Sequence, residues 1–247
     1  MSNSPNKISL VTGANKGIGL ETARQLARDH GHTVLLGARD ETRGEEAAAA
    51  LRADGLDVQF LAIDPTDDAS VAAAAKEVER RFGRLDVLVN NAGWGSRDEY
   101  STPAGQVSLA IFEETYDINV FGVARVTQAV WPLMEKSPAA RLVNVSSALG
   151  SLALHADFEN GPFLDLKPIA YDSSKAAVNM MTVHYAALWQ HTPHRANAIH
   201  PGSVKTDLNP TGDLTVEEGA KSGVELATIA DEGPNGTFSH LGKPLPW

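Results

Sequence analysis

Six short apolar segments that alternate with helical segments are the feature that most limits how this chain can fold. The apolar segments span residues 8–11, 33–37, 58–63, 86–89, 141–145 and 196–200. Their apolar residues fall on both faces, as in strands buried between two layers of helices. The helical segments between them span about residues 20–30, 45–52, 68–81, 114–134 and 171–191. This alternation, with short connections and no linker, predicts one doubly wound α/β domain over residues 1–247, with a parallel sheet covered by helices on both faces.

The carboxyl ends of the predicted strands are the places where function is expected, because ligands of open parallel sheets bind there. In this chain these ends carry glycines and polar side chains. They are Gly13 to Gly19, Arg39, Asp64, Asn90 to Gly93, Ser147 and Pro201-Gly202.

Three glycines, Gly13, Gly17 and Gly19, follow the first predicted strand and precede the first helix. Glycine permits a tight turn and lets an anion approach the backbone, while the helix N-terminus offers unpaired N–H groups and a positive dipole end. The spacing Gly-x-x-x-Gly-x-Gly differs from the Gly-x-Gly-x-x-Gly fingerprint of dinucleotide sites. A turn that merely reverses the chain is the alternative, but the position at the first strand–helix junction favours a nucleotide phosphate.

The residues after the second predicted strand indicate which dinucleotide would bind. An acidic side chain there would bind a ribose 2′-hydroxyl and repel a 2′-phosphate. Here the strand is followed by Ala38 and Arg39, and Lys16 lies in the glycine turn. Two cations in a chain of net charge −10 favour NADP(H) over NAD(H). The alternative is that Arg39 is an ordinary surface arginine.

Tyr171 and Lys175 are four residues apart and therefore share one face of a predicted helix. An ammonium group stabilises a neighbouring phenolate, so the pair predicts a Tyr171 pKa near neutral pH, far below the usual value of about 10. The same spacing also occurs by chance on solvated helices, so its meaning depends on the rest of the chain.

The motifs occur in a recognisable order along nearly the whole chain. They are Thr12-Gly-x-x-x-Gly-x-Gly19, Asn90-Asn91-Ala92-Gly93, Asn119, Ser147, Tyr171-x-x-x-Lys175 and Pro201-Gly202. In this order they resemble the short-chain dehydrogenase/reductase family, and most of all its NADPH-dependent carbonyl reductases, which share segments 12–20 and 38–44. The resemblance implies a single-domain Rossmann fold. It also implies that the protein reduces a small ketone or aldehyde to an alcohol with NADP(H).

The resemblance also implies roles for single residues. Tyr171 would be the general acid that protonates the carbonyl oxygen, and Lys175 would lower its pKa and bind the nicotinamide ribose. Ser147, rather than its neighbour Ser146, would hold and polarise the carbonyl oxygen. Asn119 would keep a water molecule next to the lysine for proton relay.

A larger set of residues is implied to contact the cofactor, from the adenine at Asp64 to the nicotinamide carboxamide at the Pro201-Gly202 turn. The set is Gly13, Asn15, Lys16, Gly17, Ile18, Gly19, Arg39, Asp64, Pro65, Asn90, Ala92, Gly93, Tyr171, Lys175, Pro201, Gly202, Val204 and Thr206. Trp94 would line the substrate pocket with Ser147 and Tyr171, or would simply pack.

Two segments are expected to shape the substrate pocket. The segment between Ser147 and Tyr171 is longer than in the commonest members of the family, and residues 152–168 resemble an insertion of the carbonyl reductases. There the insertion covers a face that other members use to form tetramers, so we expect a pocket wall and a monomer or homodimer. The alternative is an inert surface loop. Residues 207–222, rich in Gly, Asp and Thr, are expected to form a mobile lid.

The composition argues against several other classes of protein. The chain has no cysteine, which excludes disulfides and thiolate chemistry and favours a cytoplasmic location. The charge of −10 without a basic run argues against nucleic acid, and no apolar stretch reaches the roughly 20 residues of a membrane span. The histidines at positions 184, 191 and 194 lack carboxylates at a metal-site spacing, so no metal is expected.

Two alternatives to a carbonyl reductase stay open from the sequence. An alcohol dehydrogenase that works in the oxidative direction would use the same residues. A non-catalytic dinucleotide-sensing module would need the glycine turn but not the tyrosine and lysine, and this chain carries all of them.

Overall fold

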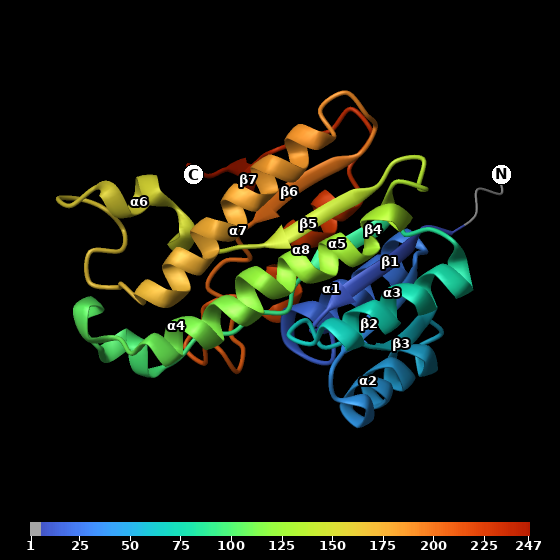
Figure 1. Ribbon diagram of the computed structural model, residues 1–247, viewed down its shortest axis with the longest axis horizontal. Helices are drawn as coiled ribbons and strands as arrows, with labels where there is room; N and C mark the ends of the chain where they lie inside the picture. Colours follow the sequence, from blue (N-terminus) through green and yellow to red (C-terminus); the bar gives the residue numbers. More distant parts are fainter. Residues whose placement is uncertain (1–5) are drawn as a thin grey trace.

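Eight strands form one sheet at the centre of the protein, seen in a computed structural model that describes residues 6–247 (Figure 1). The first five residues of the predicted domain therefore lie outside the described part. The strand order is β3-β2-β1-β4-β5-β6-β7-β8, and all neighbours are parallel except β7 and β8. The strands are β1 (Ile8–Thr12), β2 (Thr33–Ala38), β3 (Val58–Ala62), β4 (Val87–Asn90), β5 (Arg141–Val145), β6 (Arg195–Ile199), β7 (Phe238–His240) and β8 (Lys243–Pro244).

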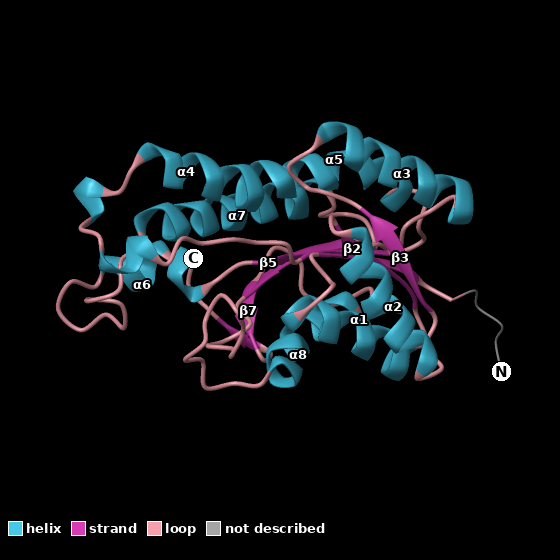
Figure 2. Cartoon of the chain, turned by 90° about the horizontal axis from the view of Figure 1, so that it is seen from below, coloured by secondary structure: helices cyan, strands magenta, loops and turns pink. Residues whose placement is uncertain are grey.

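Helices cover both faces of the sheet (Figure 2). One layer contains α3 (Asp68–Phe82), α4 (Leu109–Tyr116), α5 (Gly122–Met134) and α7 (Ile169–Leu188). The other contains α1 (Gly17–His30), α2 (Glu41–Ala53) and α8 (Val216–Ala227), while the short helix α6 (Leu152–Ala156) lies beyond one end of the sheet. Within residues 6–247, no helix combines the length and the apolar character needed to cross a lipid bilayer.

The two faces of the sheet bury two separate apolar cores. Successive side chains of a strand point to opposite faces, so Leu10 packs in the core under α3, α5 and α7, whereas Val11 packs in the core under α1, α2 and α8. Every residue of β1 and of β2 is buried. The predicted doubly wound α/β fold is confirmed.

The structure differs from the predicted helices in two places. The single helix expected over residues 114–134 is α4 and α5, joined by a π-helical turn, η3 (Asp117–Phe121). The spacing of apolar residues does not reveal such a turn. Residues 216–222 of the expected lid belong to α8, which begins with a capping box between Thr215 and Glu218. The Thr-x-x-Glu pattern is a sequence signal for a helix start that could have predicted α8.

The strand order reverses at β1, which lies between β2 and β4. At such a point the loops that follow the two central strands diverge and leave a crevice. The hydroxyl group of Thr12, the last residue of β1, accepts the backbone N–H groups of Asn91 and Ala92 at 3.0 and 3.1 Å. The ends of β1 and β4 are therefore tied together at the base of the crevice.

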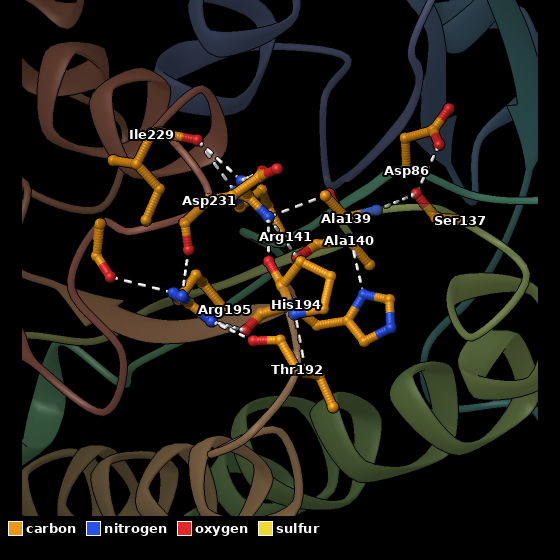
Figure 3. A network of polar contacts seen from close by, with 12 residues as sticks. Asp86, Ser137, Ala139, Ala140, Arg141, Thr192, His194, Arg195, Ile229 and Asp231 are labelled. Atoms are coloured by element: carbon orange, nitrogen blue, oxygen red, sulfur yellow. Dashed lines mark hydrogen bonds and ion pairs between the residues drawn. The ribbon is translucent and has the colours of Figure 1, made fainter.

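The buried guanidinium group of Arg141, the first residue of β5, ties three segments together (Figure 3). The Arg141 side chain is 1% exposed. It donates hydrogen bonds to the carbonyl groups of Ala139, Ala140, Pro193 and Ile229 and to the Asp231 carboxylate. The loops before β5, before β6 and after α8 therefore depend on one side chain.

Replacement of this side chain tests its contribution to stability. We expect Arg141→Met to lower the free energy of unfolding by about 3 kcal/mol or more, because several acceptors lose their donor inside the protein. Arg80→Met is the matched control. The Arg80 side chain is 71% exposed in its ion pair with Glu77, so its loss should cost less than about 1 kcal/mol. Urea denaturation measures both values, and similar losses in the two variants would contradict the assignment.

Candidate active site

Two adjoining clefts open at the carboxyl edge of the sheet, with volumes of about 910 and 750 Å³. The larger, here the glycine-turn cleft, is lined by Gly13 and residues 15–19 and by the loops after β2, β3 and β4. The smaller, here the Tyr171 cavity, is lined by Tyr171, Lys175 and the loops after β5 and β6. The two share the residues Ile18, Asn91, Gly93, Arg97, Thr206 and Leu208. A ligand can therefore extend from one cleft into the other.

Close backbone contacts shape the glycine-turn cleft. A Cβ atom at Gly13 would lie 2.9 Å from the Cα atom of Ala92, and one at Gly19 would lie 2.6 Å from the Gly13 carbonyl oxygen. Gly13 also has a φ angle of 63°, which side chains disfavour. The turn can therefore pack against the loop after β4 only with glycine at these two positions.

The N-terminus of α1 faces this cleft without a cap. Within residues 6–247, no side-chain hydrogen bond caps α1 at Lys16, and its first turn contains no acidic residue. Helices α2, α3 and α8 are capped by Asp40, Asp67 and Thr215. The unpaired N–H groups and the positive dipole end of α1 suit a phosphate group. The residues present therefore fit the pyrophosphate of a dinucleotide.

Two cations stand at the rim of the glycine-turn cleft. Arg39 is exposed, and no hydrogen bond or ion pair engages it in the described part of the chain. Its acidic neighbour Asp40 instead accepts from the backbone N–H and the guanidinium of Arg43, at 3.0 and 2.8 Å. Lys16 pairs with Asp207 at 2.6 Å, and both side chains are largely exposed. Such a pair contributes about 0–1 kcal/mol, so an incoming phosphate can replace Asp207.

The structure brings most of the predicted cofactor residues to the two clefts. Asp64, Pro65, Ala92 and Gly93 line the glycine-turn cleft together with Gly13, Asn15, Lys16, Gly17, Ile18, Gly19 and Arg39. Pro201, Gly202, Val204 and Thr206 line the Tyr171 cavity.

Asn90 is the exception among the predicted cofactor residues, because it lines neither cleft. It is the last residue of β4, and its amide donates to the Thr127 hydroxyl and to the Asn144 side chain, both at 2.9 Å. Its side chain therefore points between the sheet and α5, since alternate residues of a strand face opposite layers. The side chain of Asn90 therefore belongs to the sheet core, and only its backbone is left for a contact with the cofactor.

Tyr171, Lys175 and Ser147 come together in the Tyr171 cavity. Lys175 lies one turn after Tyr171 on α7, with its Nζ atom 5.6 Å from the centroid of the Tyr171 ring. Ser147 follows β5, and its hydroxyl is close enough to the phenol to lower the phenol's pKa. Ser146 also lines the cavity, but its hydroxyl donates to the Lys175 carbonyl at 3.3 Å. Ser147 is therefore the serine better placed to bind a ligand.

The pKa of the Tyr171 phenol is raised in this structure, which overturns the expected lowering. Burial is the largest cause, and the charges of Tyr100, Asp172 and Glu99 also raise it, whereas the hydrogen bond of Ser147 lowers it. Burial and these charges together outweigh the hydrogen bond of Ser147, because both disfavour the phenolate.

Lys175 does not offset this burial in the chain itself. Its ammonium group donates to the Val145 carbonyl at 2.8 Å, and burial lowers the Lys175 pKa to about 8. The lysine is therefore itself less readily charged than on a solvated helix. The phenol stays protonated, which is the form that a proton donor requires.

Asn119 is buried in the π-helical turn η3, where it holds the loop after β4. Its Oδ1 atom accepts the Trp94 N–H, and its Nδ2 atom donates to the Trp94 carbonyl, both at 2.8 Å. Nδ2 also lies 3.0 Å from the Ser174 hydroxyl. A Cβ atom at Gly93 would lie 3.4 Å from Oδ1 and 3.5 Å from the Lys175 Nζ atom. Asn119 is therefore near the lysine, while Trp94 lines the glycine-turn cleft and is not among the residues around the Tyr171 cavity.

The predicted insertion and lid supply apolar walls of the Tyr171 cavity. Phe163 and Leu166 come from the insertion, and Leu208 comes from the loop that precedes α8. His155 of α6 joins the insertion to α7, because its Nε2 atom lies 3.3 Å from the Asp172 carboxylate and its ring packs 5.2 Å from that of Phe163. The insertion therefore lines the Tyr171 cavity and contacts the helix that carries Tyr171.

Two residues of the site were not predicted from the sequence, Gly95 and Glu99. A Cβ atom at Gly95 would lie 2.9 Å from the Cδ2 atom of Tyr171, and Glu99 binds the first turn of α7. Neither residue carries a local signal, because their partners lie more than seventy positions away in the chain. Asn91, which belongs to the Asn-Asn-Ala-Gly motif, binds two backbone carbonyl groups at the end of β1 through its side chain.

Several known proteins with similar sequences or structures are dehydrogenases or reductases. A family model described as short chain dehydrogenase matches residues 7–215. The (+)-neomenthol dehydrogenase of Arabidopsis thaliana is 36% identical, over 94% of this chain and 95% of its own. Salutaridine reductase from Papaver somniferum superposes with a TM-score of 0.80 at 32% identity, covering 94% of this chain and 99% of its own. Carbonyl reductase from chicken fatty liver, bound to NADPH, superposes with a TM-score of 0.83 at 27% identity, over 99% of this chain and 100% of its own.

The buried lysine makes the stability of the protein depend on pH. The pKa of Lys175 falls from 10.5 to about 8 on folding, so between these values the unfolded chain binds more protons and stability rises with pH. From pH 8 to pH 10.5 we expect the free energy of unfolding of the wild type to rise by on the order of 3 kcal/mol relative to that of Lys175→Met, at about 1.4 kcal/mol per pKa unit.

Urea denaturation of both proteins from pH 7.5 to 10.5 measures this difference. Lys76→Met, at an exposed position of α3, is the control and should differ from the wild type by a constant amount. If the difference in unfolding free energy between the wild type and Lys175→Met were also independent of pH, folding would not lower the pKa of Lys175.

Proposed function

The chain belongs to the short-chain dehydrogenase family, and from this membership we propose that it reduces a ketone or aldehyde to an alcohol with NADPH. Membership makes the protein an oxidoreductase of carbonyl or alcohol substrates. The main support for carbonyl reduction with NADPH is that Ser147, Tyr171 and Lys175 lie in one cavity that adjoins the glycine-turn cleft. A dinucleotide that spans both clefts would present its nicotinamide end to these three side chains.

The preference for NADPH follows from the charges at the rim of the glycine-turn cleft. The uncapped N-terminus of α1 would hold the pyrophosphate. Arg39 and Lys16 would bind the 2′-phosphate. In the described chain the Arg39 guanidinium is unpaired, and the 2′-phosphate would replace Asp207 as the partner of Lys16. The similar carbonyl reductase from chicken fatty liver, which was solved with NADPH, supports the same choice.

The side chains of the Tyr171 cavity would supply proton transfer and polarisation. When bound, NADPH supplies the hydride for the carbonyl carbon. Tyr171 would donate its phenolic proton to the carbonyl oxygen, and its raised pKa keeps that proton in place beforehand. Ser147 would donate a hydrogen bond to the same oxygen. Lys175 would bind the ribose next to the nicotinamide, where its charge would stabilise the phenolate that forms.

The alternatives have less support from the site. The oxidative direction starts from a deprotonated tyrosine, and burial disfavours that form. A non-catalytic dinucleotide sensor does not require a serine, a tyrosine and a lysine around one cavity. The apolar walls at Phe163, Leu166 and Leu208 favour a carbonyl compound with a sizeable apolar body.

Tyr171→Phe tests the proposed proton donor. We expect NADPH to bind with an unchanged Kd, while kcat for the best substrate of a panel of ketones, aldehydes and quinones falls by about a thousandfold or more. NADPH absorbance measures turnover, and NADPH fluorescence measures binding. Tyr116→Phe on α4 is the matched control, because this tyrosine lines neither cleft. Turnover in Tyr171→Phe near the wild-type rate would remove the tyrosine from the mechanism.

Arg39→Asp tests the proposed 2′-phosphate contact. A carboxylate at this position would repel the 2′-phosphate and accept the 2′-hydroxyl of NADH. We expect the ratio of kcat/KM for NADPH over NADH to fall by at least about a hundredfold, the size of one lost charge-assisted contact plus one repulsion. Arg43→Asp, which alters the neighbouring cation that already pairs with Asp40, serves as the control. An unchanged cofactor ratio in Arg39→Asp would refute the assignment.

A further inference from the structure

The helix that carries Tyr171 has no cap of its own. Helix α7 follows Pro168, which makes no side-chain capping hydrogen bond. The backbone N–H groups of a first helical turn have no partners within the helix, so those of Ala170 and Tyr171 need acceptors from elsewhere. Unlike the open end of α1, this end is buried, since Ala170 has no exposed surface. A buried and unpaired N–H group would be costly.

Glu99 supplies both acceptors from a distant part of the chain. It lies in the short helix η1 (Asp98–Ser101) and is 1% exposed. One carboxylate oxygen accepts the Ala170 N–H at 2.9 Å, and the other accepts the Tyr171 N–H at 3.2 Å. In the described chain no basic side chain pairs with Glu99. Its negative charge is therefore balanced by the two N–H groups and by the positive dipole end of α7.

The segment that carries Glu99 holds Tyr171 from a second side. Gly95 packs so closely on the Tyr171 ring that a Cβ atom there would lie 2.9 Å from Cδ2. Gly93 packs against Lys175 in the same way, although less tightly. Residues 93–98 also line the glycine-turn cleft. One segment therefore touches the dinucleotide cleft, the face of the phenol ring and the backbone of the tyrosine.

We propose that Glu99 is the positioning residue of the catalytic tyrosine: by capping α7 from the loop after β4, it fixes the Tyr171 phenol relative to the dinucleotide cleft. The proposal rests on the proposed role of Tyr171 as the proton donor. Glu99 touches neither cleft and therefore acts only through Tyr171. A loss of this cap would let the first turn of α7 shift, and a small displacement of a reacting group reduces the rate far more than it reduces binding.

The charge of Glu99 also contributes to the surroundings of the phenol. The ionisable groups that face Tyr171 are Tyr100 and Glu99 from η1, and Asp172 and Lys175 from α7, while His155 of α6 faces Asp172. The carboxylate of Glu99 raises the pKa of Tyr171 as one of several contributions. Removal of this charge at constant shape should therefore lower the pKa of the phenol.

Glu99→Gln is the decisive variant, because it keeps the shape of the side chain but replaces one acceptor oxygen by an NH2 group. That group cannot accept a hydrogen bond from the backbone N–H that it faces. We expect kcat to fall by at least about tenfold, with KM and the NADPH Kd changed by less than about twofold. Glu99→Ala should lose more activity, because it retains neither acceptor. Glu113→Gln is the matched control, since it makes the same chemical change at an exposed position of α4, and it should behave as the wild type.

A measurement without turnover separates this proposal from the proposed function. The chain has four tyrosines, so NMR of protein labelled with ¹³C at the tyrosine Cζ atom can follow Tyr171, assigned with Tyr171→Phe. The Tyr171 resonance should shift in Glu99→Gln, because the ring surroundings change, and it should not shift in Glu113→Gln.

The outcomes divide clearly. A wild-type kcat and Tyr171 resonance in Glu99→Gln would overturn the proposal. A parallel loss of kcat, NADPH affinity and thermal stability would also overturn it, because Glu99 would then support the fold in general. If the wild type reduced no carbonyl compound but the Tyr171 resonance responded as expected, the proposed function would fail and the positioning role would stand.

Discussion

The backbone contact between the loops that follow β1 and β4 is the constraint on which the site depends. Thr12 bonds the two strand ends, and Gly13 lies against Ala92 at a distance that excludes any side chain. Because of this contact, one wall is common to the glycine-turn cleft and the Tyr171 cavity, with Asn91 and Gly93 in both. A side chain at Gly13 would push the loop after β4 outward. The loop would carry with it Gly93 and Gly95, which pack against Lys175 and Tyr171.

The N-termini of α1, α2, α3, α7 and α8 differ in how their backbone N–H groups find acceptors. Helices α2, α3 and α8 are capped by a side chain at their own start, as most surface helices are. Helix α1 is left open toward the glycine-turn cleft, where an anionic ligand can complete it. Helix α7 is closed by the distant Glu99. An acidic chain of net charge −10 can thus bind an anion, because helix dipoles and a few cations make the site locally positive.

Most of the fold could be predicted from the sequence, because buried parallel strands and their helices have a strong periodicity. The residues that line the two clefts were predictable where one short motif carries them, as for the glycine turn, Ser147 and the pair Tyr171 and Lys175. The sequence left open what depends on which way a side chain turns, as for Asn90 in the core and Trp94 at the glycine-turn cleft. It also left open the role of Glu99, because a carboxylate in a polar loop shows nothing of its partners until the fold brings α7 against it.

The Tyr171–Lys175 pair shows why a motif predicts placement better than acidity. The spacing of four residues is enough to set both side chains on one helix face, but the pKa depends on how much water the fold removes. In this protein burial raises the pKa of the phenol and lowers that of the lysine, so each group is driven toward its neutral form. A charged lysine that binds a ribose would favour the phenolate only once a dinucleotide fills the cleft. The chain by itself therefore holds a protonated tyrosine, and the binding of the dinucleotide would be the event that makes its proton easier to release.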